Sequence, residues 1–596
     1  MNFIAVMLIV LSTMPAWAGD LAITESYYRD TNASLHLMLV NNGKAPITIL
    51  PPVVNGTDTA SLGRDGLHIT NVLFYRCRPN PILTGAKADM LIALAVPTDK
   101  PATVELRSST GERLTRVIPC VPEKLTFQAI RFSRDLRSVD LYVRWSDSTR
   151  ADALKTIRMD GARMSKHMSP WPARNLDGLA YARITLSKPL DKNSYHMFEV
   201  ETDAGLSTAY QIRAIPAEFL IGVYGSPSEE SVRDWAAHGC NHYLSFGAVN
   251  PDQLDLMNAQ GISVGAKYIP QVLVDRTAGK VVPMDETAAR KALRDVMPKS
   301  SLLYHHLVDE PDVSDHYVSR TLGGSGMELI ARGELSEKED PGRYTFVQLD
   351  NTFRPNNYRV YGESADVLAT HRYSLGNFVH SEAGAQTFGR LLFFDDMTDT
   401  LIRFRQATEP KPFFMVSQFF DLGPGRSGRP PTVDEMRIQC YAMVAGGARG
   451  IIHYIHSGSG GGHEGGKTKA LWDGMTGLHA ELMRMGDIAG MGGPAPASWA
   501  TTDSPHIISS LILAGDSMAV VLINRSHRSG LEQFTARPVQ NVKVTVRIPP
   551  WMKTTGFEVI AADTGEAIPA HMDAGIVSFT VSKVEVARGF LIQPKD

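Results

Sequence analysis

The chain changes rhythm at Phe219, and this change constrains its fold more than any other feature. From there to about Gly490, short apolar runs rich in β-branched and aromatic residues alternate with segments of helical periodicity. Eight such strand-then-helix units are the pattern of a closed parallel barrel. We therefore predict a (β/α)8 TIM barrel over residues 216–490, with the long 311–343 connection as an insertion over its mouth. The strand-like runs cover residues 219–225, 240–246, 262–269, 301–308, 343–349, 366–374, 412–420 and 449–457.

The segments on both sides of this region alternate with a period of two residues. Short strand-like runs separated by Asn, Gly and Pro fill residues 19–215 and return after Gly490. This spacing is typical of β-sandwich modules. A chain of 596 residues is too long for a single core, so several domains are expected. We predict a multidomain β plus α/β protein with N-terminal β-sandwiches at 19–120 and 121–215 and a C-terminal β-sandwich at 491–596.

The first eighteen residues resemble an export signal. An apolar run leads to Ala16-Trp17-Ala18, which has the small-x-small pattern of a cleavage site. We therefore predict a signal peptide at 1–18 and a secreted or periplasmic protein. Because the run lacks Lys and Arg, a retained amino-terminal anchor is the alternative. No other segment approaches the ~20 apolar residues of a membrane span, so none is expected in the mature chain.

Charge and cysteine content exclude several classes of partner. With 60 basic and 63 acidic residues, the net charge of −3 gives no footprint for nucleic acid or anionic lipid. The four cysteines contain no CxxC pair, which leaves a zinc site of that type unsupported. Cys77 and Cys120 share one strand-rich region and can bridge in an oxidising compartment, whereas Cys240 and Cys440 have apolar neighbours typical of buried thiols. No cofactor is predicted, and the oligomeric state is left open.

The fourth strand-like run ends in two adjacent acids, Asp309 and Glu310, followed by Pro311. Proline does not continue a central strand, so the acids are expected at the strand's carboxyl end. In a (β/α)8 barrel this end faces the active-site mouth. The alternative is that Asp309 caps the next helix and Glu310 lies in its first turn, where the helix dipole favours an acid.

The other predicted strands bring aromatic and polar groups to the same mouth. Such a set suits a sugar, because sugar rings stack on aromatic faces and hydroxyls need polar partners. About half of these residues are expected to pack rather than bind, since alternate strand residues face the helices or the barrel core. No HExxH or comparable spacing accompanies the histidines, so no metal is predicted. The predicted substrate-binding residues are His242, Tyr243, Lys267, His371, Arg372, Tyr373, Gln418, His453, Tyr454 and His456.

Three segments together resemble (β/α)8 glycoside hydrolases similar to clan A: Asp309-Glu310-Pro311, residues 365–373 and residues 446–454. The resemblance covers only the barrel. It implies a carbohydrate substrate and Glu310 as the general acid/base. Two positions depart from the clan pattern, because Asp309 replaces an Asn and Gln418 stands where the nucleophile Glu is expected. Glutamine cannot form the glycosyl-enzyme ester, so the usual double displacement is in question.

An Asp-Glu pair at the end of the fourth strand also resembles substrate-assisted β-hexosaminidases. That resemblance implies that Glu310 protonates the leaving oxygen while Asp309 orients the substrate's own 2-acetamido group. A third alternative is inversion, which needs a second carboxylate about 6.5–9.5 Å away. Its candidates are Asp421, Asp395, Asp396 and Glu464. Two functions of other classes stay open: a catalytically silent carbohydrate-binding protein and a structural surface component.

Overall fold

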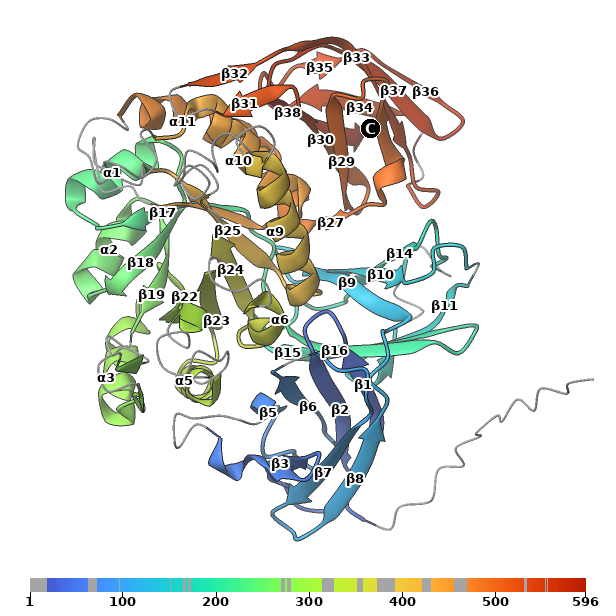
Figure 1. Cartoon of the computed structure of the whole chain (residues 1–596), viewed down its shortest axis with the longest axis vertical. Coiled ribbons are helices and arrows are strands. Elements are labelled where there is room, and N and C mark those ends of the chain that lie inside the picture. The colour runs from blue at the N-terminus through green and yellow to red at the C-terminus, as the bar shows by residue number, and fades with distance from the viewer. Residues whose placement is uncertain are drawn as a thin grey trace, which may run out of the picture.

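Eight parallel strands close into a barrel at the centre of the computed structural model (Figure 1). Each of the eight predicted runs overlaps one of them, which confirms the predicted barrel. The strands are β17 (Leu220–Gly225), β18 (His242–Ala248), β19 (Ser263–Lys267), β22 (Leu302–Asp309), β23 (Tyr344–Asp350), β24 (Val367–His371), β25 (Phe413–Gln418) and β26 (Gly450–Tyr454). The structure describes residues 19–62, 72–95, 97–150, 152–164, 168–169, 173–268, 274–275, 280–313, 326–350, 357–371, 373, 392–420, 430–454, 469–529, 533–552, 554 and 556–595.

Several of the helices around the barrel begin at residues that cap them. Ser228 accepts a hydrogen bond from Ser231 N at the start of α1, and Thr432 accepts one from Glu435 N at the start of α10. Both pairs form reciprocal capping boxes, which satisfy amide groups that the first turn leaves free. The described helices of this region are α1 (Glu229–Ala237), α2 (Pro251–Ala259), α3 (Glu286–Val296), α5 (Gly326–Glu339), α6 (Asn357–Tyr361), α9 (Leu392–Thr408), α10 (Val433–Ala445), α11 (Lys469–Arg484) and α12 (Gly486–Met491).

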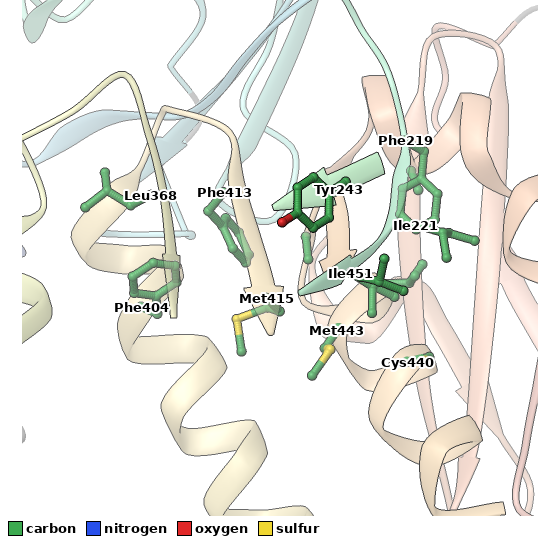
Figure 2. Close-up of a cluster of buried hydrophobic side chains, with 14 of the residues drawn as sticks. Phe219, Ile221, Tyr243, Leu368, Phe404, Phe413, Met415, Cys440, Met443 and Ile451 are labelled. Atoms are coloured by element: carbon green, nitrogen blue, oxygen red, sulfur yellow. The ribbon is translucent and has the colours of Figure 1, made fainter. Parts of the chain in front are cut away.

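Alternate residues of each barrel strand enter two different apolar layers. On β25, Phe414 and Val416 point into the barrel interior, whereas Phe413 and Met415 join the layer between strands and helices. Figure 2 shows this outer layer, in which Met415 lies near Phe404 of α9 and Ile451 lies near Met443 of α10. Because strand side chains alternate with a period of two, the same run of sequence serves both layers.

Paired antiparallel sheets precede the barrel (Figure 1, blue to cyan). Two four-stranded sheets share one apolar core in the first module, and two more share another core in the second. The first pair comprises β1 (Leu21–Arg29), β2 (Ser34–Asn41), β6 (Lys87–Leu94) and β5 (Val72–Arg78), facing β4 (Thr57–Asp58), β3 (Ile49–Val54), β7 (Ala102–Ser108) and β8 (Arg113–Ile118). The second comprises β13 (Met168–Ser169), β14 (Leu179–Thr185), β10 (Ser138–Trp145) and β9 (Leu125–Phe132), with β12 (Ala162–Arg163), β11 (Leu154–Met159), β15 (Tyr195–Thr202) and β16 (Ser207–Arg213).

A further pair of sheets follows the barrel and packs against α10 (Figure 1, red). One sheet contains β27 (Gly493–Pro494), β29 (Ile507–Ala514), β30 (Ser517–Asn524), β38 (Ala587–Pro594), β34 (Phe557–Ala561) and β35 (Ala567–Ile568). The other contains β28 (Ala500–Thr502), β33 (Val539–Arg547), β37 (Ile576–Val584) and β36 (Ala570–Asp573). Short ribbons are formed by β20 (Val274–Asp275) with β21 (Lys280–Val281), and by β31 (His527–Ser529) with β32 (Phe534–Ala536).

The 311–343 connection, which the sequence predicts to be an insertion over the mouth, contains a barrel helix in its described part. Residues 326–339 form α5, the ordinary helix after the fourth strand. Its apolar residues Leu329, Ile330 and Leu335 are buried in the core that also holds Leu73 and Phe74 of the first module. This helix therefore links the barrel to the first pair of sheets; residues 314–325 lie outside the described part.

The structure bears on the possible disulfide and on membrane spans. All four cysteines are free thiols, so Cys77 and Cys120 are not bridged. No helix among the described residues is long and apolar enough to span a bilayer. The predicted signal peptide lies outside the described residues, and export stays a prediction.

Candidate active site

Asp309 and Glu310 lie at the carboxyl end of β22, as the sequence predicts for mouth residues. Glu310 adopts a left-handed backbone conformation with φ of 50°, and its N–H donates to the Gln348 carbonyl at 2.9 Å. A non-glycine residue in this region costs roughly 1–3 kcal/mol, and such residues cluster at active sites. The sequence did not predict this conformation, because nothing in Asp-Glu-Pro requires it.

The Asp309 carboxylate is held by side chains of two other barrel strands. The Tyr224 hydroxyl donates to Oδ2 at 2.7 Å, and the Lys267 ammonium lies 3.4 Å from the same oxygen. The other oxygen, Oδ1, is buried and has no hydrogen-bond partner among the described residues. These contacts contradict the alternative that Asp309 caps the next helix. Burial opposes ionisation of Asp309, but Lys267, His306 and the Tyr224 hydrogen bond outweigh it and lower the pKa below its usual value.

Glu310 has the opposite electrostatic environment from its neighbour. Its side chain is 34% exposed, and Oε1 lies 3.6 Å from His371 Nε2. Burial of the carboxyl, reinforced by the nearby charges of Asp309 and Asp350, raises its pKa to about 7 despite the opposing effect of His371. Near neutral pH, Glu310 is therefore poised to hold or release a proton.

A second acid reaches the site from the fifth strand. Asp350 Oδ1 lies 3.3 Å from His371 Nε2, and the two residues are paired in register on β23 and β24. On the far side of the imidazole, Gln348 Nε2 lies 3.4 Å from Nδ1. Burial disfavours the charged imidazole, but its hydrogen bond to Asp350 and the surrounding carboxylates raise the pKa of His371. Ligand atoms of Glu310, Asp350 and His371 all lie within 4.8 Å of one another.

Aromatic rings stand beside these acids. The Tyr373 ring stacks on His371 at 4.3 Å between centroids and on Tyr454 at 5.7 Å, and Phe420 meets both tyrosines edge-on. Tyr454 also contacts Tyr224, the residue that binds Asp309. The set offers ring faces and hydroxyls within reach of the carboxyl pair, which is the composition of a sugar subsite.

Three of the predicted binding residues lie elsewhere, which corrects the prediction for them. His242 is the first residue of β18, where it is fully buried and bonded to Ser263 and Tyr304. Tyr243 stacks on Trp235 and belongs to the outer apolar layer (Figure 2), and His453 joins Ser417 to His479. Tyr243 and His453 alternate outward toward the helices, whereas His242 points into the barrel interior at the amino end, away from the mouth.

The remaining predicted residues divide into three groups: residues at the site, buried Gln418, and residues that are not described. Lys267, His371, Tyr373 and Tyr454 belong to the site, while Gln418 is buried and donates from its amide to the Phe420 carbonyl at 3.3 Å. The end of β25 therefore carries an amide at the position where the clan A pattern has a carboxylate nucleophile. Arg372, His456, Asp421 and Glu464 lie outside the described residues, and the side chains of Asp395 and Asp396 are not described.

Sequence reasoning missed Tyr224, Gln348 and Asp350. Each lies among the last three residues of its strand: Tyr224 on β17, and Gln348 and Asp350 on β23. The same strand-end rule that selected Asp309 would have found them. Tyr224 lies beside Tyr454 in register, and Asp309 lies beside Gln348, so strand ends form a continuous ring.

No protein-family model and no curated sequence matches the chain. Among solved structures, it is similar to a Paenibacillus cycloisomaltooligosaccharide glucanotransferase with 10% identity and a TM-score of 0.42, covering 79% of this chain and 99% of that one. It is similar to an α-L-fucosidase from Paenibacillus thiaminolyticus with 10% identity and a TM-score of 0.39, covering 63% and 100%. An endoxylanase from Clostridium papyrosolvens has 12% identity and a TM-score of 0.38, covering 64% and 98%.

Proposed function

We propose that this protein is an exported glycoside hydrolase in which Glu310 is the general acid and Asp309 orients a 2-acetamido group of the substrate. The observation that carries the proposal is the contrast between two adjacent carboxyls. Asp309 is held ionised by Lys267 and Tyr224, whereas Glu310 has a pKa raised to about 7. Two neighbouring carboxyls whose environments separate their pKa values support one acid and one charged partner.

The partial exposure of Asp309 supports substrate assistance. Its side chain is 26% exposed although Oδ1 is buried, so a substrate can reach the carboxylate only at Oδ2. The amide N–H of a 2-acetamido group would donate to Oδ2, which Tyr224 and Lys267 keep in place. The acetamido oxygen, turned toward the anomeric carbon, then replaces the protein nucleophile that Gln418 cannot supply.

The proposed reaction has two steps. Glu310 donates its proton to the glycosidic oxygen as the bond to the anomeric carbon breaks and the acetamido oxygen bonds to that carbon. The resulting cyclic cation is balanced by the negative charge of Asp309. Water then attacks the anomeric carbon, its proton passes to the Glu310 carboxylate, and the acetamido group is restored. Tyr454, whose side chain is partly exposed, would contact the sugar ring, while Tyr373 is held between Tyr454 and His371.

One further carboxylate favours a second mechanism for the same function. Asp350 places an oxygen within 4.8 Å of one on Glu310, closer than the 6.5–9.5 Å of inverting enzymes and near the ~5–5.5 Å of retaining ones. Asp350 would then be the nucleophile. Its side chain is only 9% exposed, against 26% for Asp309, which makes Asp309 the better placed to meet a substrate.

The test is hydrolysis of paired glycosides that differ only at C2, one bearing an acetamido group and the other a hydroxyl. We expect turnover of at least one acetamido substrate, little or none of its hydroxyl counterpart, and loss of turnover in Glu310→Gln. Hydrolysis that ignores the C2 group contradicts the role of Asp309. Glycan binding with no hydrolysis across the panel contradicts the enzyme and favours a silent binding protein.

A further inference from the structure

We infer that Glu310, Asp350 and His371 form a binding site for Zn²⁺, and that zinc bound there inhibits the enzyme by occupying the oxygen that carries the catalytic proton. The inhibition rests on the proposed function, whereas the binding does not. Within the described part of the chain, this is the only group of three such residues whose ligand atoms converge.

Two of the three separations between the ligand atoms approach those of a tetrahedral metal site, and the third, between the two carboxylates, is within 4.8 Å. Zinc bonds of ~2.0–2.1 Å to nitrogen and oxygen at tetrahedral angles separate neighbouring ligand atoms by about 3.3–3.4 Å. His371 Nε2 lies 3.3 Å from Asp350 Oδ1 and 3.6 Å from Glu310 Oε1. The hydrogen bond from Nε2 to Asp350 is long at 3.3 Å, and the 3.6 Å to Glu310 exceeds the 2.7–3.2 Å typical of N–H···O hydrogen bonds.

The residue behind the imidazole gives an independent reason to place a metal on Nε2. Gln348 is 2% exposed, its Oε1 has no partner in the described part of the chain, and its amide faces His371 Nδ1 at 3.4 Å. The amide nitrogen and oxygen are exchangeable assignments. With Oε1 turned toward Nδ1, the glutamine accepts a hydrogen bond from Nδ1–H, and the lone pair of Nε2 faces the two carboxylates. A second residue that fixes a histidine in this way is a common feature of zinc sites.

Charge and access also fit. Two carboxylates neutralise a divalent cation, while the third acid of the site, Asp309, already has Lys267 as its counter-ion. Asp350 and His371 are buried, and Glu310 at 34% exposure leaves one side open for the ion and for a water as fourth ligand.

Calorimetric titration of the whole chain with zinc chloride near pH 7.5 tests the site. We expect one ion per chain, an affinity reduced at least 100-fold in His371→Asn, and a reduction of about 10–100-fold in Gln348→Leu. The matched control is His196→Asn. His196 also faces a carboxylate, with Nδ1 2.7 Å from Asp160 Oδ2, but belongs to no group of three converging ligands among the described residues. It should bind zinc as the wild type does.

A second readout makes the result independent of the variants' folding. Co²⁺ in place of zinc should give the intense visible absorption of a tetrahedral site in the wild type. Absence of stoichiometric binding in the wild type, or equal affinity in His371→Asn, overturns the site. Zinc that binds at these residues without slowing an active substrate overturns the inhibition. If no glycoside is hydrolysed at all, the proposed function fails, but calorimetry still decides the metal site.

Discussion

Two polar groups at opposite ends of the barrel are buried under different conditions. At the amino end of β18, both ring nitrogens of His242 have partners, at 2.9 Å to Ser263 and 2.8 Å to Tyr304. At the carboxyl end of β22, Asp309 has one oxygen with no donor among the described residues, and Glu310 has a left-handed backbone. Satisfied groups stabilise the fold, whereas strained ones cluster at functional sites. This contrast distinguishes His242, a scaffold residue, from the acid pair of the candidate site.

The largest expected effect is that of Glu310→Gln. Removing the proton donor should lower kcat/KM on a glycoside with a poor leaving group by about 10²–10⁴-fold. Steady-state kinetics measure the loss, and an unchanged melting temperature shows that the fold is intact. Wild-type turnover in this variant would contradict the assignment of Glu310 as the proton donor.

Substitution of the charged partner should rank next and decide between the two mechanisms. Under substrate assistance, Asp309→Asn should lower kcat/KM by about 10²–10³-fold, the range seen when a group that stabilises a charged transition state is lost. Asp350→Asn should have a smaller effect. The reverse order, together with a covalent glycosyl adduct on Asp350 detected by mass spectrometry, would assign the nucleophile to Asp350.

The pH profile gives a smaller but more specific effect. Since Glu310 acts when protonated and its pKa is raised to about 7, kcat/KM should fall as the pH rises through about 7. His371 lowers the pKa of Glu310, so His371→Asn should move this alkaline limb to higher pH. A limb that stays in place in His371→Asn would show that another group controls it.

The smallest effect on activity is expected at the amino end. His242→Phe leaves the Tyr304 hydroxyl without its partner and should cost about 1–3 kcal/mol of unfolding free energy with kcat/KM unchanged. Burial lowers the pKa of His242 from 6.5 to about 3, so the unfolded chain binds the extra proton between these values. Wild-type stability from this residue should therefore be lost as the pH falls below about 6.5, and denaturant melts of the variant should lack that contribution. A fall in turnover at unchanged stability would place His242 in the site.

The sequence predicted the barrel and the position of the acid pair because both depend on local pattern. Apolar runs that alternate with helices define the strands, and Pro311 marks where one strand ends. It did not distinguish His371 from His242, since both are strand histidines whose direction depends on register and on where the strand begins. It also missed Asp350, which immediately follows a predicted run, and could not reveal the left-handed backbone of Glu310 or that Asp309 Oδ1 has no donor among the described residues.

The most direct test of Glu310 as the proton donor is to measure how the loss of activity in Glu310→Gln depends on the leaving group of the substrate. Aryl and alkyl 2-acetamido glycosides with the same sugar would be compared in wild type and Glu310→Gln. A general acid is needed most by a poor leaving group, so we predict a large loss on the alkyl glycoside and a loss near zero on a dinitrophenyl glycoside. An equal loss on both would contradict proton donation by Glu310.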